Sequence, residues 1–316
     1  MRSALVTGTA GFIGSSLARN LLSEGIEVIG IDNLSDSYDV ALKQQNLSAL
    51  VGQPGFRFEQ VDLLDIDLLP LVQASDVVFH LAAMPGVRSS WSTGFERYVE
   101  NNVLGLQRLL EALRESPGTR MVWASSSSVY GNTDGSPSRE DSALHPYSPY
   151  GVTKAAGEHL CSAYVENFGL EIVALRYFTV YGPGQRPDMG LHRLCEAALG
   201  RYDFHLFGDG EQVRDMTFVD DVVDATRSAA RVTGLDGEFL VVNIAGGTKV
   251  TLNELIAELE DMAETSIPLI REPQQAGDVR TTAADASRAR ERLGWAPRRT
   301  LTQGLAAQLE WHRQRT

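Results

Sequence analysis

Tyr150 and Lys154 are the residues whose types and spacing point most directly to chemistry. Residues four apart share one face of a helix, so the two side chains would be neighbours there. A lysine ammonium beside a phenol favours the phenolate and would lower the pKa of Tyr150. Such a phenolate takes a proton from an alcohol hydroxyl near neutral pH. A surface tyrosine beside a solvated lysine has the same spacing, so the pair gains meaning from the rest of the chain.

A glycine-rich turn lies close to the N-terminus, between a short apolar segment and a segment of helical pattern. Gly8, Gly11 and Gly14 would let the backbone approach a pyrophosphate, which then meets the first N–H groups of the helix. The G-x-x-G-x-x-G spacing differs from the commoner G-x-G-x-x-G, but a preceding strand and a following helix are the context of a dinucleotide site. We therefore expect this turn, with Phe12 and Ile13, to bind a dinucleotide.

Asp32 and Asn33 close the second expected strand. An acidic side chain at this place accepts hydrogen bonds from the adenosine ribose and repels the 2′-phosphate of NADP. The next cation along the chain is Lys43, so we expect no basic side chain beside Asp32 and predict NAD as the cofactor. Asp62 closes the third expected strand and would lie near the adenine.

The first 180 residues alternate between apolar segments of strand length and segments of helical pattern. Near-continuous apolar strands separated by amphipathic helices are typical of a parallel sheet that is covered on both faces. The expected fold class is therefore α/β, a doubly wound parallel sheet with its ligand at the carboxyl ends of the strands. The expected strands span 2–7, 27–32, 56–62, 76–83, 120–125 and 171–178, and the expected helices span 12–24, 99–113 and 150–168.

Beyond residue 183 turn residues become denser and segments shorten, which indicates a smaller, partly interleaved C-terminal lobe. A strand at 239–245 would return to the main sheet. The expected division assigns 1–180, with 218–248, to the cofactor and 181–217 with 249–316 to the substrate. The other expected elements are strands at 204–207 and 212–218, and helices from 220 and at 251–264, 285–293 and 302–313.

Composition excludes several classes of function. The net charge of -13 argues against nucleic acid and anionic membranes as partners. No apolar run approaches the roughly 20 residues that span a bilayer. The N-terminus lacks the pattern of a signal peptide, and Cys161 and Cys195 lack metal-ligand spacing. We therefore expect a cytoplasmic protein without a metal site.

Further motifs are spread over the whole chain. They are His80-Leu81-Ala82-Ala83, Asn102-Val103-Leu104-Gly105, the serine-rich stretch 125–131, Arg176-Tyr177-Phe178, Val180-Tyr181-Gly182-Pro183 and the stretch 214–221. With the glycine turn and the Tyr/Lys pair, they resemble the extended short-chain dehydrogenase/reductase superfamily in its sugar-nucleotide epimerase/dehydratase branch. The resemblance implies a Rossmann-type fold, a tightly held NAD and a nucleoside-diphosphate sugar as substrate. It also implies a homodimer built on helices near 101–115 and 150–168.

The resemblance implies roles for individual residues as well. Ser126, Tyr150 and Lys154 would form the catalytic trio, in which Tyr150 takes a proton from a sugar hydroxyl while hydride leaves that carbon. Ser126 would bridge hydroxyl and phenol, and Lys154 would reach the nicotinamide ribose. In an epimerase the keto sugar then rotates and regains hydride on its other face, without net oxidation. Other residues implied to contact NAD are Asp62, Leu63, Leu81, Ala82, Ala83, Asn102 and Tyr177.

Ser127 and Ser128 separate the reactions of this branch. Sugar 4,6-dehydratases carry an Asp-Glu pair at these two places, and UDP-glucuronate decarboxylases usually carry glutamate at the second. The serines therefore argue against elimination and, less strongly, against decarboxylation. Together with Thr179, which stands where many members have asparagine, they offer donors for a substrate carboxylate. The alternative is a polar strand end that merely packs against the nicotinamide.

Stretches 82–88 and 184–194 resemble the corresponding segments of UDP-glucuronate 4-epimerases. Arginines in and near them are candidates for the acidic groups of the substrate, because a guanidinium binds such groups in a fork. The expected contacts are Arg88, Arg186 and Arg193 near the sugar, Arg214 and Arg280 at the diphosphate, and Asp278 at the nucleoside ribose.

The predicted function is NAD-dependent 4-epimerisation of a UDP-hexuronic acid, UDP-glucuronate to UDP-galacturonate, through a transient 4-keto intermediate. The alternatives are a UDP-glucose 4-epimerase acting on neutral hexoses and a UDP-glucuronate decarboxylase. A non-catalytic dinucleotide sensor is disfavoured, because such proteins usually lack the Tyr/Lys pair. The chain has no basic stripe or recognition motif for nucleic acid.

Overall fold

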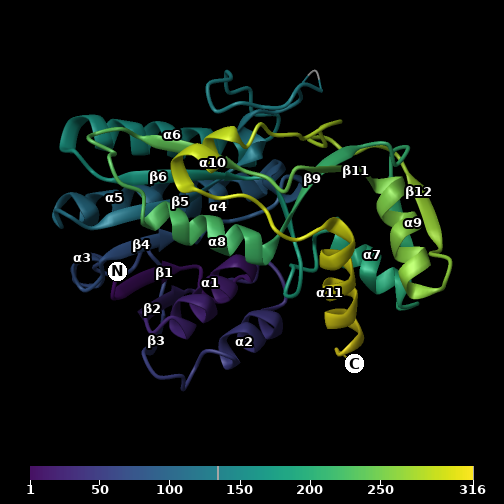
Figure 1. Ribbon diagram of the computed structural model, residues 1–316, viewed down its shortest axis with the longest axis horizontal. Coiled ribbons are helices and arrows are strands. Elements are labelled where there is room, and N and C mark those ends of the chain that lie inside the picture. The colour runs from purple at the N-terminus through teal and green to yellow at the C-terminus, as the bar shows by residue number, and fades with distance from the viewer. Residues whose placement is uncertain (134, 316) are drawn as a thin grey trace.

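A parallel sheet of seven strands forms the centre of the molecule in a computed structural model that describes residues 1–133 and 135–315 (Figure 1). Every neighbouring pair in this sheet is parallel, as the continuous apolar strands predict. In spatial order the strands are β10 (Leu240–Ile244), β6 (Ile172–Tyr177), β5 (Arg120–Ser126), β4 (Val77–His80), β1 (Ser3–Thr7), β2 (Glu27–Asp32) and β3 (Phe56–Gln60).

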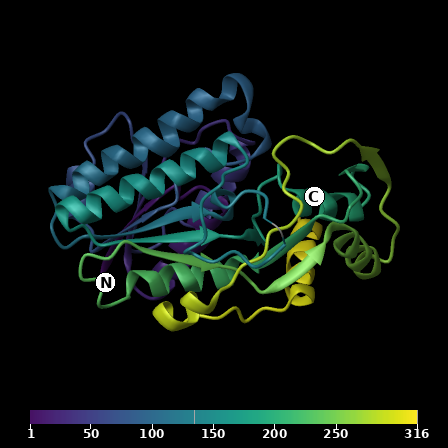
Figure 2. The same ribbon diagram turned by 90° about the horizontal axis from the view of Figure 1, so that it is seen from above.

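Helices cover both faces of the sheet, which Figure 2 shows nearly edge-on. Because side chains alternate along a strand, Ala4 and Val6 of β1 enter one core and Leu5 enters the other. The first core lies under α1 (Phe12–Ser23) and α8 (Val219–Ala230). The second lies under α3 (Leu69–Gln73), α5 (Gly105–Arg114) and α6 (Pro149–Phe168). The α/β doubly wound fold predicted from the sequence is therefore confirmed.

A smaller lobe sits beyond the carboxyl ends of the strands. It contains a three-stranded sheet in the order β11-β9-β7 and a parallel pair, β8 with β12. Its strands are β7 (Thr179–Tyr181), β8 (Phe204–Phe207), β9 (Val213–Phe218), β11 (Thr248–Thr251) and β12 (Leu269–Glu272). Its helices are α7 (Gly190–Ala198), α9 (Leu252–Ala263) and α11 (Leu301–Arg313), and α10 (Ser287–Leu293) lies back beside α8 and β10.

Several elements differ from the sequence expectations. The strands expected at 56–62 and 76–83 are shorter, because the chain leaves the sheet after Gln60 and after His80, and the residues that follow line the cavity described below. The helix expected at 99–113 is α4 (Phe95–Val99), a π turn (Glu100–Leu104) and α5 in succession. The patterns did not predict α2 (Val40–Ser48), α3, α7, β7, β11 or β12. No helix in the described part of the chain is long and apolar enough to cross a membrane.

Candidate active site

A cavity of about 760 Å³ opens where the carboxyl ends of the central strands meet the smaller lobe. The ends of β1, β2, β4 and β5 form its floor, and β7, β8 and the segment before α7 close it from the lobe. A crevice at this edge is the usual ligand site of a doubly wound sheet. Among the residues expected at the site, those that do not line the cavity are Asn102 and Arg280.

Local structure brings Tyr150 beside Ser126. The side chain of Ser148 caps α6 by accepting a hydrogen bond from the Gly151 N–H at 3.1 Å, so the helix begins just before Tyr150. A Cβ on Gly151 would stand 2.5 Å from the Ser128 carbonyl oxygen, so only glycine allows this approach. The Ser126 hydroxyl accepts from the Ser128 N–H at 3.1 Å and is hydrogen-bonded to the Tyr150 phenol.

The electrostatics of the pair differ from the sequence expectation. Burial raises the pKa of Tyr150, while the hydrogen bond to Ser126 and the Arg186 guanidinium act to lower it. The expected lowering of the Tyr150 pKa by Lys154 is therefore wrong, because desolvation outweighs these effects. Burial also lowers the pKa of Lys154 to about 8. Its Nζ donates to the Ala124 carbonyl at 2.7 Å, which holds the ammonium against β5.

The glycine turn has the geometry of a dinucleotide cradle. Gly8 has a φ of +71°, and a Cβ there would stand 2.8 Å from the Ala82 nitrogen. A Cβ on Gly14 would collide with the Gly8 carbonyl, so α1 packs directly on the turn. No side chain caps α1 at Gly11, and Gly11 and the first residues of the helix line the cavity. An uncapped helix start of this kind fits a pyrophosphate.

Asp32 lies at the adjoining end of β2. Its carboxylate accepts from the N–H groups of Ala10 and Leu34 at 3.1 and 2.9 Å. Burial raises the pKa of Asp32, and the Leu34 hydrogen bond and Lys43 oppose this shift. Asn33 donates to Asp62 at 2.7 Å, which joins the ends of β2 and β3. Oxygen acceptors at this depth fit the ribose and adenine end of a dinucleotide.

Lys43 and Tyr38 also line this end of the cavity, and the sequence did not predict them there. The expectation that no cation stands near Asp32 is wrong, because α2 folds Lys43 back toward that carboxylate. Lys43 Nζ donates to the Ser35 carbonyl at 2.8 Å and lies 4.9 Å from the Tyr38 ring centroid. The buried Tyr38 hydroxyl has no hydrogen-bond partner within the described residues, so it is available to a ligand.

Hydroxyl groups and one guanidinium line the same cavity as Tyr150. Ser127 and Ser128 form a 3-10 turn after β5, and Thr179 begins β7. Arg186 is close enough to Tyr150 to affect its pKa, and its guanidinium is held by the carboxylate of Asp188 through two contacts of 2.9 Å. Neutral donors and a partly buried cation are groups that can bind a carboxylate.

The far end of the cavity carries further charged side chains. Arg88 pairs with Asp278 at 2.7 Å and stacks over the Phe207 ring, with 4.3 Å from its guanidinium carbon to the ring centroid. Arg214 also lines this end, and its pKa is lowered by burial while Asp278 raises it. Arg193 lines the cavity nearer Met189, at the start of α7. This end therefore suits a group that is both aromatic and anionic.

Two expected contacts lie elsewhere. The amide of Asn102 is buried and holds the segment after β4, since it accepts from the Met84 N–H at 2.7 Å and donates to the Met84 carbonyl and to Thr153. Asn102 therefore supports the cavity wall without lining it. The guanidinium of Arg280 is turned to the surface, where it pairs with both carboxylate oxygens of Asp209 at 2.7 and 2.9 Å.

Comparison with known proteins covers nearly the whole chain. The family model described as GDP-mannose 4,6 dehydratase matches residues 5–308. An uncharacterized UDP-glucose epimerase, YtcB, of Bacillus subtilis (strain 168) is 44% identical over 97% of this chain and 96% of that protein. The UDP-glucuronate 4-epimerase of Thermodesulfobacterium geofontis (strain OPF15) is 36% identical over 98% and 96%. The structure of UDP-glucuronic acid 4-epimerase from Bacillus cereus in complex with UDP-glucuronic acid and NAD superposes with a TM-score of 0.95 at 41% identity, over 99% of each chain.

Proposed function

The chain belongs to the GDP-mannose 4,6-dehydratase family, and within it we propose an NAD-dependent 4-epimerase that interconverts UDP-glucuronate and UDP-galacturonate. The protein is an enzyme, and NAD is its cofactor. Relatives that carry this name and a solved complex with UDP-glucuronic acid and NAD support the proposal. The glycine cradle, the uncapped start of α1 and the unpaired Tyr38 hydroxyl fit the dinucleotide.

The observation that carries the proposal is the chemistry of the wall beside Tyr150. Ser127, Ser128 and Thr179 present neutral hydroxyls to the cavity, and Arg186 adds a positive charge. A sugar carboxylate placed next to the reacting carbon would meet these donors, and the nearby carboxylate of Asp188 is already paired with Arg186. An acid and a base for eliminating water are missing from the two positions after Ser126. The wall therefore favours a hexuronate and an outcome that leaves the sugar's atoms unchanged.

The residues of the trio move one proton in each direction. NAD, when bound, supplies the acceptor and later the donor of hydride at the sugar C4. Tyr150 takes the proton from the C4 hydroxyl, and Ser126 holds hydroxyl and phenol in one hydrogen-bonded line. Lys154 is cationic below pH of about 8 and would favour the phenolate against the opposing effect of burial on Tyr150. After the keto sugar has turned its other face, Tyr150 returns the proton to the new hydroxyl.

The 4-keto form of a glucuronate is a β-keto acid, which loses carbon dioxide when its carboxylate stands perpendicular to the ring carbonyl. A 4-epimerase must therefore hold the carboxylate away from that orientation. We assign this task to the hydroxyls of Ser127, Ser128 and Thr179, which line the cavity. Ser127 and Ser128 follow the end of β5, and Thr179 is the first residue of β7. A glutamate at the second place would repel the carboxylate instead of holding it.

The nucleotide would occupy the far end of the cavity. Arg88 and Arg214 would bind the diphosphate, and Asp278 the nucleoside ribose. Substrate binding must then exchange the Arg88–Asp278 pair for contacts with the ligand. In this division of the chain, 1–180 with 218–248 hold NAD, and 181–217 with 249–315 hold the sugar nucleotide. Thr316, the end of the expected second range, lies outside the described residues.

A second candidate is 4-epimerisation of the neutral UDP-glucose, which the name of the 44% identical relative favours. The discriminating experiment incubates purified protein with UDP-glucuronate or UDP-glucose, without added NAD, and resolves the products. We expect UDP-galacturonate from the first, made by enzyme that has retained its cofactor. Conversion of UDP-glucose alone would establish the neutral-sugar reaction. UDP-pentose with carbon dioxide would establish a decarboxylase, and Tyr150→Phe serves as the inactive control for all three.

We further propose that the protein is a cytoplasmic homodimer. α5 and α6 run side by side along one face, next to α4 (Figure 2). Large apolar side chains on this face are exposed, among them Val99, Leu104 and Val152 at 40, 44 and 47%. Contiguous exposed apolar surface usually marks an interface. A second copy of the same face would cover these side chains in a helix bundle.

A further inference from the structure

Glu158 and Arg176 form a buried ion pair directly behind the catalytic edge of the sheet. Glu158 lies on α6, one turn after Lys154, and Arg176 lies on β6. Arg176 Nε donates to Glu158 Oε1 at 2.9 Å and Nη2 to Oε2 at 2.6 Å. The two side chains are only 4 and 5% exposed. At this depth either charge alone is very unfavourable, so the two groups hold each other in one geometry.

The carboxylate of Glu158 also holds Ser125, the residue before Ser126. Ser125 Oγ donates to Glu158 Oε1 at 2.6 Å. In the parallel register of β5 and β6, Ser125 stands opposite Arg176, and the next pair is Ser126 with Tyr177. One carboxylate therefore joins α6, β5 and β6 immediately before the reacting groups.

Lys154 is fixed to the same strand one residue earlier, through the 2.7 Å hydrogen bond from Nζ to the Ala124 carbonyl. Lys154 and Glu158 share one face of α6, so this face contacts two successive residues of β5. Cys161 and Glu158 on α6 act to raise the pKa of Lys154 against the effect of burial, its charge acts in turn on His80 on β4, and its Nζ lies 5.2 Å from the centroid of the Trp123 ring on β5. Glu158 is the carboxylate among them.

We propose that Glu158, held by Arg176, is a positioning residue that fixes Ser126 relative to Lys154 and keeps Lys154 in its ammonium form. This inference rests on the proposed function, in which Ser126 and Lys154 assist Tyr150 in taking the proton of the sugar hydroxyl. It assigns a role in the reaction to a pair that does not line the cavity.

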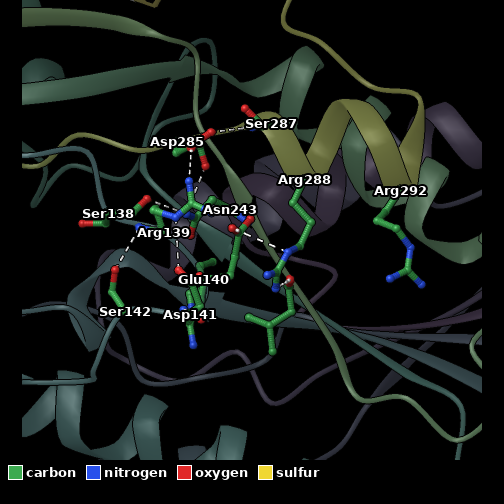
Figure 3. A network of polar contacts seen from close by, with 12 residues as sticks. Ser138, Arg139, Glu140, Asp141, Ser142, Asn243, Asp285, Ser287, Arg288 and Arg292 are labelled. Atoms are coloured by element: carbon green, nitrogen blue, oxygen red, sulfur yellow. Dashed lines mark hydrogen bonds and ion pairs between the residues drawn. The ribbon is translucent and has the colours of Figure 1, made fainter.

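Arg176 extends the connection toward the smaller lobe. Its Nη1 donates to the Tyr130 hydroxyl at 2.7 Å, and that hydroxyl donates to Asn243 Oδ1 at 2.7 Å. The Asn243 amide donates to the carbonyls of Ser138 and Asp285 at 2.9 and 3.3 Å, and Figure 3 shows these three residues together. The segment before Asp285 lines the cavity. The ion pair is therefore connected by hydrogen bonds to the substrate side as well.

The first test measures steady-state kinetics of Glu158→Gln per NAD-loaded site. We expect kcat to fall roughly ten- to a hundredfold through misplacement of the trio. KM for the UDP-sugar should change little, because the arginines that bind the nucleotide are untouched. Glu171→Gln is the matched control, since Glu171 pairs with Arg120 at 2.6 Å across the same two strands at their opposite ends.

The second test needs no turnover. The chain has three lysines, Lys43, Lys154 and Lys249, so ¹³C-lysine labelling of the holoenzyme gives few signals to assign. Lys154→Arg identifies the signal of Lys154. In Glu158→Gln we expect Lys154 to titrate at lower pH than in the parent, because the ammonium has lost its carboxylate while Arg176 stays charged. The titration should be unchanged in Glu171→Gln.

A Lys154 titration that is the same in parent and Glu158→Gln overturns the proposal, whatever happens to kcat. If Glu158→Gln does not fold, the double variant Glu158→Leu/Arg176→Met removes both charges at similar volume, a replacement that buried pairs often tolerate. A double variant with parental kcat overturns the proposal as well. A parent enzyme that converts no UDP-sugar would refute the proposed function, whereas the lysine titration would still decide the role of Glu158.

Discussion

At the scale of single residues, the charge of Lys154 should limit the enzyme at alkaline pH. Burial lowers the pKa of Lys154 to about 8, so the side chain is cationic at neutral pH and loses its proton as pH rises through that value. In the proposed reaction, the phenolate of Tyr150 then loses the positive charge of Lys154. We expect kcat to be lost above pH of about 8, measured from initial rates of UDP-sugar epimerisation.

Lys154→Arg is the informative variant, because a guanidinium stays protonated throughout this range. Its kcat should be lower than that of the parent, since the planar group does not fit the ammonium's place against Ala124. Its alkaline limb should nevertheless be absent. An alkaline limb that persists unchanged in Lys154→Arg would show that another group sets it.

The hydroxyls beside Tyr150 should decide how cleanly the keto intermediate is processed. In Ser127→Ala and Thr179→Ala the carboxylate loses a donor and gains freedom to stand perpendicular to the ring carbonyl. We expect the amounts of UDP-pentose and carbon dioxide to rise relative to UDP-galacturonate. The reason is that a hydrogen bond to a charged group contributes about 1.5–3 kcal/mol, and each variant removes one such bond. Ser162→Ala, on α6 and outside the cavity lining, is the control. Unchanged product ratios in both cavity variants would contradict the assigned role.

At the scale of elements, the approach of α6 to the 3-10 turn after β5 sets the distance between Tyr150 and Ser126. In Gly151→Ala the added methyl would stand 2.5 Å from the Ser128 carbonyl oxygen, so the helix start must move. We expect kcat to fall about a hundredfold, because proton transfer tolerates little misplacement. Bound NAD and the circular dichroism spectrum should resemble those of the parent. A variant with parental kcat would show that the 3-10 turn after β5 moves to accommodate the methyl group and that the start of α6 stays in place.

The sequence predicted those elements that have a strong apolar period. β1, β2, β5, β6 and β10 are buried on both faces, and their near-continuous apolar runs are legible without a structure. The short strands β7, β11 and β12 could not be predicted, because three or four residues contain too little alternation. α2 is mostly polar, with Lys43 and Leu47 as its buried residues, so it too shows no apolar stripe.

The site residues divide in the same way. Glycines and charged residues at strand ends were predictable, since topology alone brings strand ends to one edge. The positions of Tyr38 and Lys43 depend on how α2 folds back, and the surface pairing of Arg280 depends on Asp209, which is far away in the sequence. The direction of the Tyr150 pKa shift depends on how deeply the phenol is buried. The spacing of Tyr150 and Lys154 in the sequence does not predict this burial.

At the scale of the whole molecule, the two lobes contribute different residues to the cavity. In the proposed function, the seven-stranded sheet would supply the cofactor cradle and the trio, while β7, β8 and the segment before α7 would supply groups that contact the sugar and its nucleotide. Members of the family can therefore share one oxidation step and differ in product through the second set of residues. Ser127 and Ser128 stand at the boundary, at the end of β5.

The exposed apolar face of α4, α5 and α6 predicts that the protein forms a dimer. We expect the parent protein to have twice the mass of one chain by sedimentation or light scattering. The double variant Val99→Glu/Leu104→Glu should be monomeric. A dimer of it would bury four carboxylates, two from each subunit, without groups of opposite charge to pair with them. Leu269→Glu/Ile270→Glu on β12 is the matched control, since these residues are 37 and 39% exposed on the other lobe and should leave the dimer intact. A monomeric parent, or a control that dissociates as readily, would place the interface elsewhere or remove it.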